Sequence, residues 1–196
     1  MENFFRRLSK RHSTPKQVQK FLRQFPYNNE SGNETQRSAL QGAKSGTLHC
    51  LEATLVAAAI LEHQGYPPLV LSLESIDELD HVVFIFKAKS GWGAVGKSRL
   101  EGLHGRQPKF RSIRDLAWSY FDPFIDKTGR LTGYGVAHLD DTGSDWRYSK
   151  NNVWKLVHYL IDLPHEKIQS SQKRFEKGRR HFNKTGQAGW PQATWW

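Results

Sequence analysis

The most apolar segment of this chain begins at its only cysteine, Cys50. From Cys50 to Glu62 every residue is compatible with a helix, and none is glycine or proline. Gly46 and Thr47 supply a break and a cap before the segment, and Gly65 follows its end. The sequence therefore predicts one central apolar helix, around which the rest of the chain must be arranged.

Cys50 occupies the first turn of this predicted helix, a position that favours the thiolate. The unpaired N–H groups of a helix N-terminus and the positive end of the helix dipole both lower the pKa of a thiol. His81 begins the apolar strand 81–87. A lone cysteine is usually a small buried hydrophobe, but a helix-opening thiol and a strand-opening imidazole are the usual parts of nucleophilic cysteine catalysis.

The composition allows one domain with its own core. The 196 residues, of which 37% are hydrophobic and 12% aromatic, fit a single compact unit. One cysteine excludes an intrachain disulfide, which suits a reducing compartment. No apolar stretch reaches the ~18 residues that span a bilayer, and the N-terminus lacks the apolar region of a secretory signal. We therefore expect a cytoplasmic protein without a transmembrane segment.

The net charge of +10 is concentrated at the two ends. Residues 1–20 hold six Lys or Arg against one acid, and residues 165–196 hold seven against two, which gives +5 at each end. Residues 21–164 hold 16 basic and 16 acidic residues and are neutral. The sequence predicts three parts: a basic N-terminal arm (1–12), a folded domain (13–164), and a basic C-terminal helix with a tail (165–196).

Periodicity and turn residues predict the other elements. The predicted helices are 16–25, 34–43, 50–62, one capped by Ser112, one over 151–163 capped by Ser149, and one over 165–182. The predicted strands are 68–73, 81–87 and 92–97, with a loop over 98–111 and a short strand or irregular segment over 129–139. Helices, a small antiparallel sheet and further helices make the fold class α+β.

Strand alternation decides which side chains can join His81, and the residue before it points to the opposite face. If the hairpin pairs Lys87 with Trp92, His81 lies opposite Ser98, whereas a slip of two residues would place Gly96 there. A third catalytic residue is expected at this cross-strand position.

Two segments resemble the motifs of a known superfamily. Residues 46–52, Gly-Thr-Leu-His-Cys-Leu-Glu, resemble the cysteine motif of the transglutaminase-like superfamily, which shares the papain-type catalytic core. Residues 80–83, Asp-His-Val-Val, resemble its histidine motif, and a tryptophan-containing return strand follows. Residues 14–150 as a whole look like a group of bacterial transglutaminase-like proteins.

The resemblance implies both a fold and a chemistry. The fold is a central helix that starts at the cysteine and packs on a small antiparallel sheet, here with extra helices at both ends. Cys50 would be the nucleophile and His81 its base. Family members act on amide bonds as peptidases, deamidases or transamidases, so a peptide or protein substrate is expected and no cofactor.

The third residue of the family, an aspartate on the return strand, is missing, because residues 92–98 contain no carboxylate. The acid of a triad holds the imidazole in one tautomer and stabilises the imidazolium. The Ser98 hydroxyl can hold the tautomer but offers no charge. A dyad of Cys50 and His81 remains chemically sufficient, because a thiol is already a good nucleophile.

Other polar residues are weaker candidates. His49 is a second candidate for the base, although neighbouring side chains at a helix start diverge. Tyr27 and Gln41 lie upstream of the cysteine, where a donor could stabilise an oxyanion. Glu52 is expected as a buried polar contact, and Glu62 at a solvated helix end. No pair of the nine histidines has the spacing of a zinc motif, so no metal is expected.

Two other functions remain open from the sequence. Without the acid, the fold could be an inactive module that binds a peptide or protein in the cleft. The basic ends could bind nucleic acid or an anionic membrane weakly, through cations interleaved with aromatic side chains. At the C-terminal end these residues are Lys173, Arg174, Phe175, Lys177, Arg179, Arg180, Phe182, Lys184 and Trp190. A solvated basic helix face is the simpler interpretation, since no nucleic-acid motif accompanies them. The sequence does not indicate an oligomeric state.

Overall fold

The computed structural model describes all residues except 1, 31, 33, 79 and 189–195. Its α-helices are α1 (Glu2–Arg11), α2 (Pro15–Arg23), α3 (Ala39–Ser45), α4 (Cys50–Leu61), α5 (Ile113–Trp118), α6 (Phe121–Phe124), α7 (Trp154–Ile161) and α8 (Gln172–Thr185). Its strands are β1 (Leu69–Ser75), β2 (His81–Ala88), β3 (Gly91–Val95), β4 (Arg106–Phe110), β5 (Leu131–His138) and β6 (Glu166–Lys167). Short 3-10 turns are η1 (Glu62–Gln64), η2 (Glu101–Leu103) and η3 (Leu139–Thr142).

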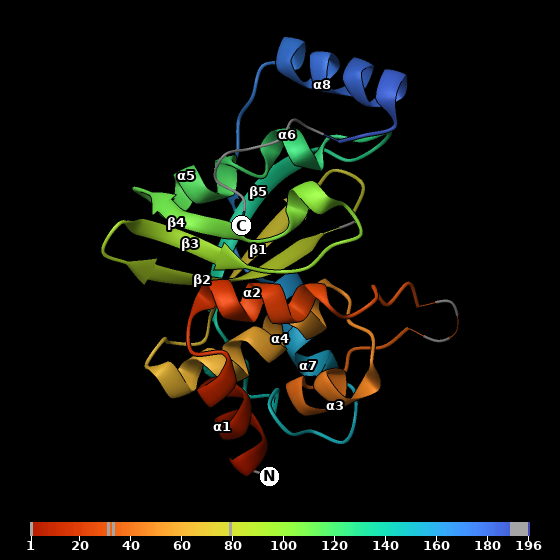
Figure 1. Ribbon diagram of the computed structural model, residues 1–196. Helices are drawn as coiled ribbons and strands as arrows, with labels where there is room; N and C mark the ends of the chain where they lie inside the picture. The colour runs from red at the N-terminus through yellow and green to blue at the C-terminus, as the bar shows by residue number, and fades with distance from the viewer. Residues whose placement is uncertain (1, 31, 33, 79, 189–195) are drawn as a thin grey trace.

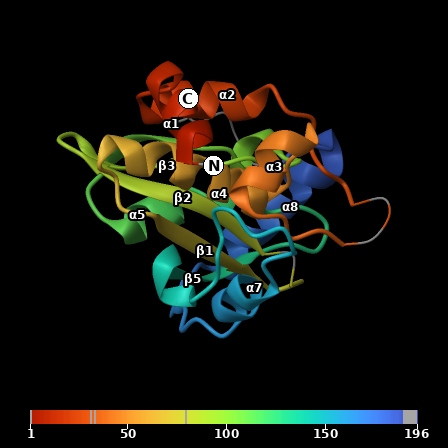
Figure 2. The same cartoon turned by 90° about the horizontal axis from the view of Figure 1, so that it is seen from below.

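The strands form one sheet between two layers of helices (Figures 1 and 2). The strand order is β4-β3-β2-β1-β5-β6, and every neighbouring pair is antiparallel. Helices α1 to α4 and α7 lie on one face, α5 and α6 cover the other, and α8 packs outside α6. The predicted α+β class is therefore confirmed, and the antiparallel sheet has six strands.

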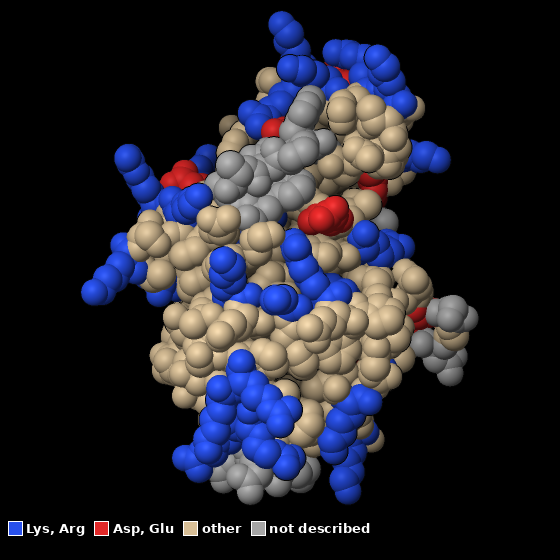
Figure 3. All heavy atoms as spheres, viewed as in Figure 1, with Lys and Arg blue, Asp and Glu red and all other residues tan. Residues whose placement is uncertain are grey.

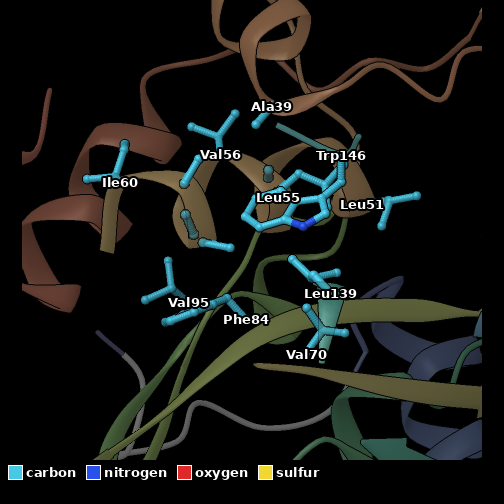
Figure 4. Close-up of a cluster of buried hydrophobic side chains, with 14 of the residues drawn as sticks. Ala39, Leu51, Leu55, Val56, Ile60, Val70, Phe84, Val95, Leu139 and Trp146 are labelled. Atoms are coloured by element: carbon cyan, nitrogen blue, oxygen red, sulfur yellow. The ribbon is translucent and has the colours of Figure 1, made fainter. Parts of the chain in front are cut away.

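Helix α4 lies inside the larger core because it is apolar on every side. Residues 51–61 are all buried, and side chains such as Leu55 share one hydrophobic cluster with Phe84 of β2 (Figure 4). The Thr54 hydroxyl donates to the Val82 carbonyl at 3.0 Å. This bond and the surrounding apolar contacts fix the helix against the middle of the sheet, with the half-buried cysteine at its N-terminal end.

The β2–β3 hairpin has the first of the two registers considered, but it ends early. Lys87 lies opposite Trp92, and the ladder stops at the pair formed by Phe84 and Val95. Beyond it, the side-chain amide of Gln19 in α2 binds both backbone groups of Gly96, each at 2.9 Å. The chain therefore leaves the sheet before it reaches a position opposite the first residue of β2.

Two segments that the sequence assigned to other structures are edge strands. Strand β4 lies in the predicted loop 98–111 and pairs with β3. Strand β6 occupies the start of the predicted helix 165–182 and pairs with β5, so α8 begins only at Gln172, where the Ser171 hydroxyl accepts the Arg174 N–H at 3.2 Å. Short edge strands depend on their neighbours for pairing, so local pattern predicts them poorly.

Three helix starts also differ from the prediction. His49, and not Thr47, is the N-cap of α4, and its N–H donates to Glu52 Oε2 at 3.1 Å. The N-cap of α7 is Val153 and not Ser149. The helix predicted over 34–43 begins only at α3, because the preceding polar segment bonds to the start of α4 instead.

Both basic ends contact the body of the molecule. Phe5 of α1 is fully buried in the core around α4. At the other end, Arg174 of α8 pairs with Asp122 at 2.6 Å, and the Trp196 indole donates to the Ala94 carbonyl at 3.0 Å. Lys and Arg gather over α1 and α8 (Figure 3). In the part of the chain that is described, we find no helix with the length and hydropathy of a membrane span.

Gln19 offers a direct test of how the hairpin ends. We expect Gln19→Ala to lower the free energy of unfolding by about 1–3 kcal/mol, because it leaves buried backbone groups of Gly96 without a partner. Gln24→Ala, at the exposed end of α2, should change it by less than about 0.5 kcal/mol. Urea denaturation followed by circular dichroism measures both. Equal midpoints for the wild type and Gln19→Ala would contradict a stabilising role of the bonds between Gln19 and Gly96.

Candidate active site

The N-terminus of α4 lies where three segments meet. The residue pair Tyr27 and Leu48 forms a parallel bridge, and the Leu48 N–H donates to the Pro26 carbonyl at 3.1 Å. These bonds bring the end of the α2 segment alongside the residues before Cys50. The start of β2 approaches from the sheet, so that Cys50 and His81 line the same cavity.

This cavity has a volume of about 420 Å³ and is open to solvent. Cys50, His49 and His81 lie together in its wall. The residues His49 and His81 are 5% and 4% exposed, respectively, whereas Cys50 is half-buried. The two residues that the sequence analysis selected for a dyad are therefore brought together, and the second candidate base joins them.

The environment of Cys50 favours the thiolate. Burial alone would raise the pKa of the thiol, but hydrogen bonds with His49 and His81 and the positive charge of both imidazoles lower it to about 5. The helix N-terminus acts in the same direction. A thiol with this pKa is ionised at neutral pH and is a competent nucleophile.

His81 is oriented by a backbone carbonyl. Its Nε2 lies 2.8 Å from the Leu103 oxygen, which can only accept, so Nε2 carries the proton and Nδ1 is left for the thiol. The Ser98 hydroxyl, predicted for this role, accepts the Leu100 N–H at 3.2 Å instead. Ser98 lines the cavity, but the early end of the hairpin removes it from the cross-strand position.

A buried arginine holds the loop that carries Leu103. The Arg106 guanidinium is fully buried and donates to the carbonyls of Gly102 at 2.7 Å and His104 at 2.8 Å. It lies over the Tyr120 ring, 3.9 Å from the centroid. Arg106 is thus a positioning residue for His81. No sequence pattern predicted this role, because Arg106 lies in a segment that was interpreted as a loop.

His49 has a different set of partners from His81. Its Nε2 lies 2.7 Å from the Thr35 carbonyl, 3.5 Å from Glu52 Oε1 and 3.9 Å from Glu30 Oε1. Burial alone would lower the pKa of His49, but the hydrogen bond to Cys50, the charges of Cys50 and Glu52, and the bond to Thr35 raise it to about 9. A carboxylate is therefore present at the site, beside His49.

Glu52 is fully buried and paired. Its carboxylate accepts from Arg37 Nη2 at 2.8 Å and from the His49 N–H at 3.1 Å. Burial raises the pKa of Glu52, but Arg37 and His49 together lower it below its ordinary value. The expected buried polar contact is thus an ion pair that fixes the start of α4. Glu62, at the other end, pairs with Arg147 at 2.7 Å.

Of the two upstream candidates, Tyr27 reaches the site. It lines the cavity, and burial and the charge of Cys50 raise the pKa of its hydroxyl, against the lowering effect of Arg99 and of a hydrogen bond from the Cys50 backbone. The neutral hydroxyl therefore lies against the Cys50 N–H. Gln41 binds the Lys150 carbonyl from α3 instead and does not line the cavity.

Among the described residues, no group of three or more His, Cys, Asp or Glu side chains has the arrangement of a metal site.

No protein-family model matches this chain, and no curated protein sequence matches it.

Alkylation of Cys50 tests the thiolate directly, because no other thiol competes in this chain. We expect the iodoacetamide rate to fall to half near pH 5, the pKa of Cys50 in this site, and not near the ordinary 9. The sign follows from the ion pair: below pH 5 the thiol is protonated and unreactive, and above it the thiolate is present.

Single variants test the contribution of each imidazole to the pKa of Cys50. His81→Ala and His49→Asn, which keeps a capping side chain, should each move the midpoint up by about 1–3 pH units, because each removes a cation next to the thiolate. His63→Ala, on the exposed turn η1, is the matched control. A wild-type midpoint near 9, or variants indistinguishable from the control, would contradict the site.

Proposed function

We propose that this protein is a cysteine-dependent enzyme that acts on an amide bond of a peptide or protein. The observation that carries the proposal is the Cys50 thiol between two imidazoles in the wall of an open cavity. A buried structural cysteine has no need of a lowered pKa, whereas a nucleophile does.

The reaction would proceed by acyl transfer. Cys50 Sγ attacks the carbonyl carbon, and the bond to nitrogen breaks as His81 gives its proton to the leaving amine. The product is a thioester. Water or a second amine then attacks the thioester and gives a proton to His81, and the thiolate leaves. The Tyr27 hydroxyl, which lies against the Cys50 N–H, would serve together with that N–H as donor to the developing oxyanion, once their mutual bond is exchanged.

The two imidazoles would have separate roles. A group that keeps its proton up to a pH of about 9 is a poor base at neutral pH, so His49 serves as the cation that stabilises the thiolate. His81 contacts the Leu103 carbonyl through Nε2 and the Cys50 thiol on its other side. It is therefore the group suited to carry the proton to the leaving amine.

This assignment agrees with the resemblance to the transglutaminase-like superfamily. The segments around Cys50 and His81 resemble its two motifs, and the helix that starts at the cysteine packs on an antiparallel sheet, which supports a transglutaminase-like fold. Hydrolysis, deamidation and transamidation all begin with the same thioester. The reaction needs no cofactor, and a free thiolate suits the cytoplasm.

An activated ester tests the acyl chemistry without knowledge of the substrate. With p-nitrophenyl acetate we expect a burst of one equivalent of nitrophenol and a protein mass increased by one acetyl group on Cys50, followed by slow turnover. Cys50→Ala should abolish the burst. His81→Ala should slow turnover by about 10²–10⁴-fold, the usual contribution of general acid–base catalysis. Control variant His63→Ala should behave as wild type.

The same experiment tests the main alternative, in which the protein is a non-catalytic module that binds a peptide in the cleft. It is favoured by the lack of a carboxylate behind His81, whose partner Leu103 offers only a carbonyl. A stable acetyl-enzyme that does not turn over, with no effect of His81→Ala, would support this alternative and contradict the enzyme.

Nucleic-acid binding by the basic ends would be a separate property, because α1 and α8 do not line the cavity. If α8 binds single-stranded DNA, replacing Arg179, Arg180 and Lys184 with glutamine should reduce the slope of log affinity against log salt by about 2. Lys89→Gln, in the exposed hairpin turn, is the control. Fluorescence anisotropy measures the slope, and an unchanged slope would exclude α8 as the contact.

A further inference from the structure

The cavity beside Cys50 has a charge opposite to that of the chain. The chain as a whole has a net charge of +10, yet the cavity wall contains six carboxylates and one guanidinium, that of Arg99, beside the Cys50 thiolate and the His49 imidazolium, whose charges cancel. The carboxylates belong to Glu30, Glu34, Asp77, Glu78, Asp80 and Asp126. The charged residues that line the cavity are thus mostly acidic, although the chain as a whole is basic.

These carboxylates come from three separate segments around the site. Glu30 and Glu34 precede α3, Asp77, Glu78 and Asp80 connect β1 to β2, and Asp126 follows α6. The cavity is therefore acidic on more than one side of Cys50, and a ligand that reaches the thiol passes between negative charges.

Neutral donors hold several of these carboxylates in place. Asp80 accepts the Ser75 N–H at 2.8 Å, Asp126 accepts the Gly129 N–H at 2.7 Å, and Glu30 accepts the Thr35 N–H at 2.7 Å. Within the described residues, no Lys or Arg lies at ion-pair distance from Glu34, Glu78, Asp80 or Asp126. Backbone bonds fix the geometry of Asp80 and Asp126 but leave their charges available.

The pKa of Asp80 reflects both its burial and the charges around it. Burial raises its pKa, the Ser75 N–H and His165 lower it, and the like charges of Glu74 and Asp77 raise it further, with a net rise. The electrostatic repulsion between such carboxylates in the free protein is relieved when a cation binds between them.

Another part of the cavity wall, formed by α7, is apolar. Val157, Leu160 and Ile161 of α7 line it, and Ile161 is 66% exposed. An exposed isoleucine at the edge of a binding cavity is a contact for an apolar side chain of a ligand.

We propose that the segment bound by this cleft is a cationic peptide, with lysine or arginine side chains near the reacting amide and an apolar side chain against α7. The reacting amide rests on the proposed function, whereas the basic side chains rest only on the charge of the cavity. The same charge repels acidic peptides and nucleic acid from the thiol, whatever the basic ends bind.

Charged thiol reagents measure the local potential at Cys50 without any catalysis. The probes are three methanethiosulfonates of similar size: aminoethyl (cationic), sulfonatoethyl (anionic) and methyl (neutral). Each rate is divided by the rate of the neutral reagent and by the corresponding ratio for 2-mercaptoethanol. We expect the cationic reagent to react about tenfold faster than the anionic one at low salt, and the preference to shrink as salt is added.

Matched variants locate the charges responsible. The triple variant Glu78→Gln, Asp80→Asn and Asp126→Asn keeps the hydrogen-bond acceptors and should remove most of the preference. Asp141→Asn, on the exposed turn η3, should keep it. Equal rates in the wild type, or a preference that the triple variant retains, would overturn the proposal.

Peptides then test the ligand itself. The probes are three peptides that each contain a glutamine and a leucine, with lysines, serines or glutamates as the flanking residues. Each peptide is titrated for its ability to protect Cys50 from iodoacetamide. We expect the lysine peptide to protect at a concentration at least about tenfold lower than the glutamate peptide. Protection by the lysine peptide without release of ammonia or amine would support the cationic ligand and contradict the enzyme. Acyl chemistry with equal protection by all peptides would do the reverse.

Discussion

The burial of α4 on every side is the constraint on which the site depends. A helix whose residues 51–61 are all buried can lie only in the interior, between the sheet and the surrounding helices. Its N-terminus then falls at the end of β2, where the chain enters the sheet at His81. Apolar packing, and no catalytic contact, thus brings the thiol and the imidazole within reach of each other.

The polar groups around this N-terminus follow from the same burial. A buried helix start must have its N–H groups satisfied, and Glu52 accepts one of them from His49 while it pairs with Arg37. A buried carboxylate next to a buried imidazole raises the pKa of that imidazole and so favours its cationic form. The cap of α4 and the cation beside the thiolate are therefore one and the same residue, His49.

The charges of the molecule are separated in space. Cations gather over α1 and α8 (Figure 3), whereas the carboxylates of the cavity wall lie in the connections around α3, β2 and α6. Net charge alone would suggest a polyanionic partner. The residues that line the cavity point to a cationic one, because screening limits the influence of charges more than about 10 Å away.

Several features could be predicted from the sequence because they depend on local pattern. The helix that starts at Cys50 and the strand that starts at His81 follow from residue periodicity, and the short turn limits the hairpin to two registers, of which the structure has the pairing of Lys87 with Trp92. The same pattern placed the thiol and the imidazole at the first residues of a helix and of a strand. It also extended the hairpin by simple continuation, which is why Ser98 was expected opposite the imidazole.

Only the tertiary structure decided what surrounds the pair. Gln19, far away in the sequence, ends the hairpin at Gly96, and the Leu103 carbonyl orients His81 in place of Ser98. Contacts between distant segments leave no periodicity in a single sequence, so Arg106 and the acidic cavity wall gave no signal. The sequence by itself determined the helix that starts at Cys50 and the strand that starts at His81, because these follow from local physics. The second imidazole partner, the orienting carbonyl and the charge that a ligand meets were decided by packing.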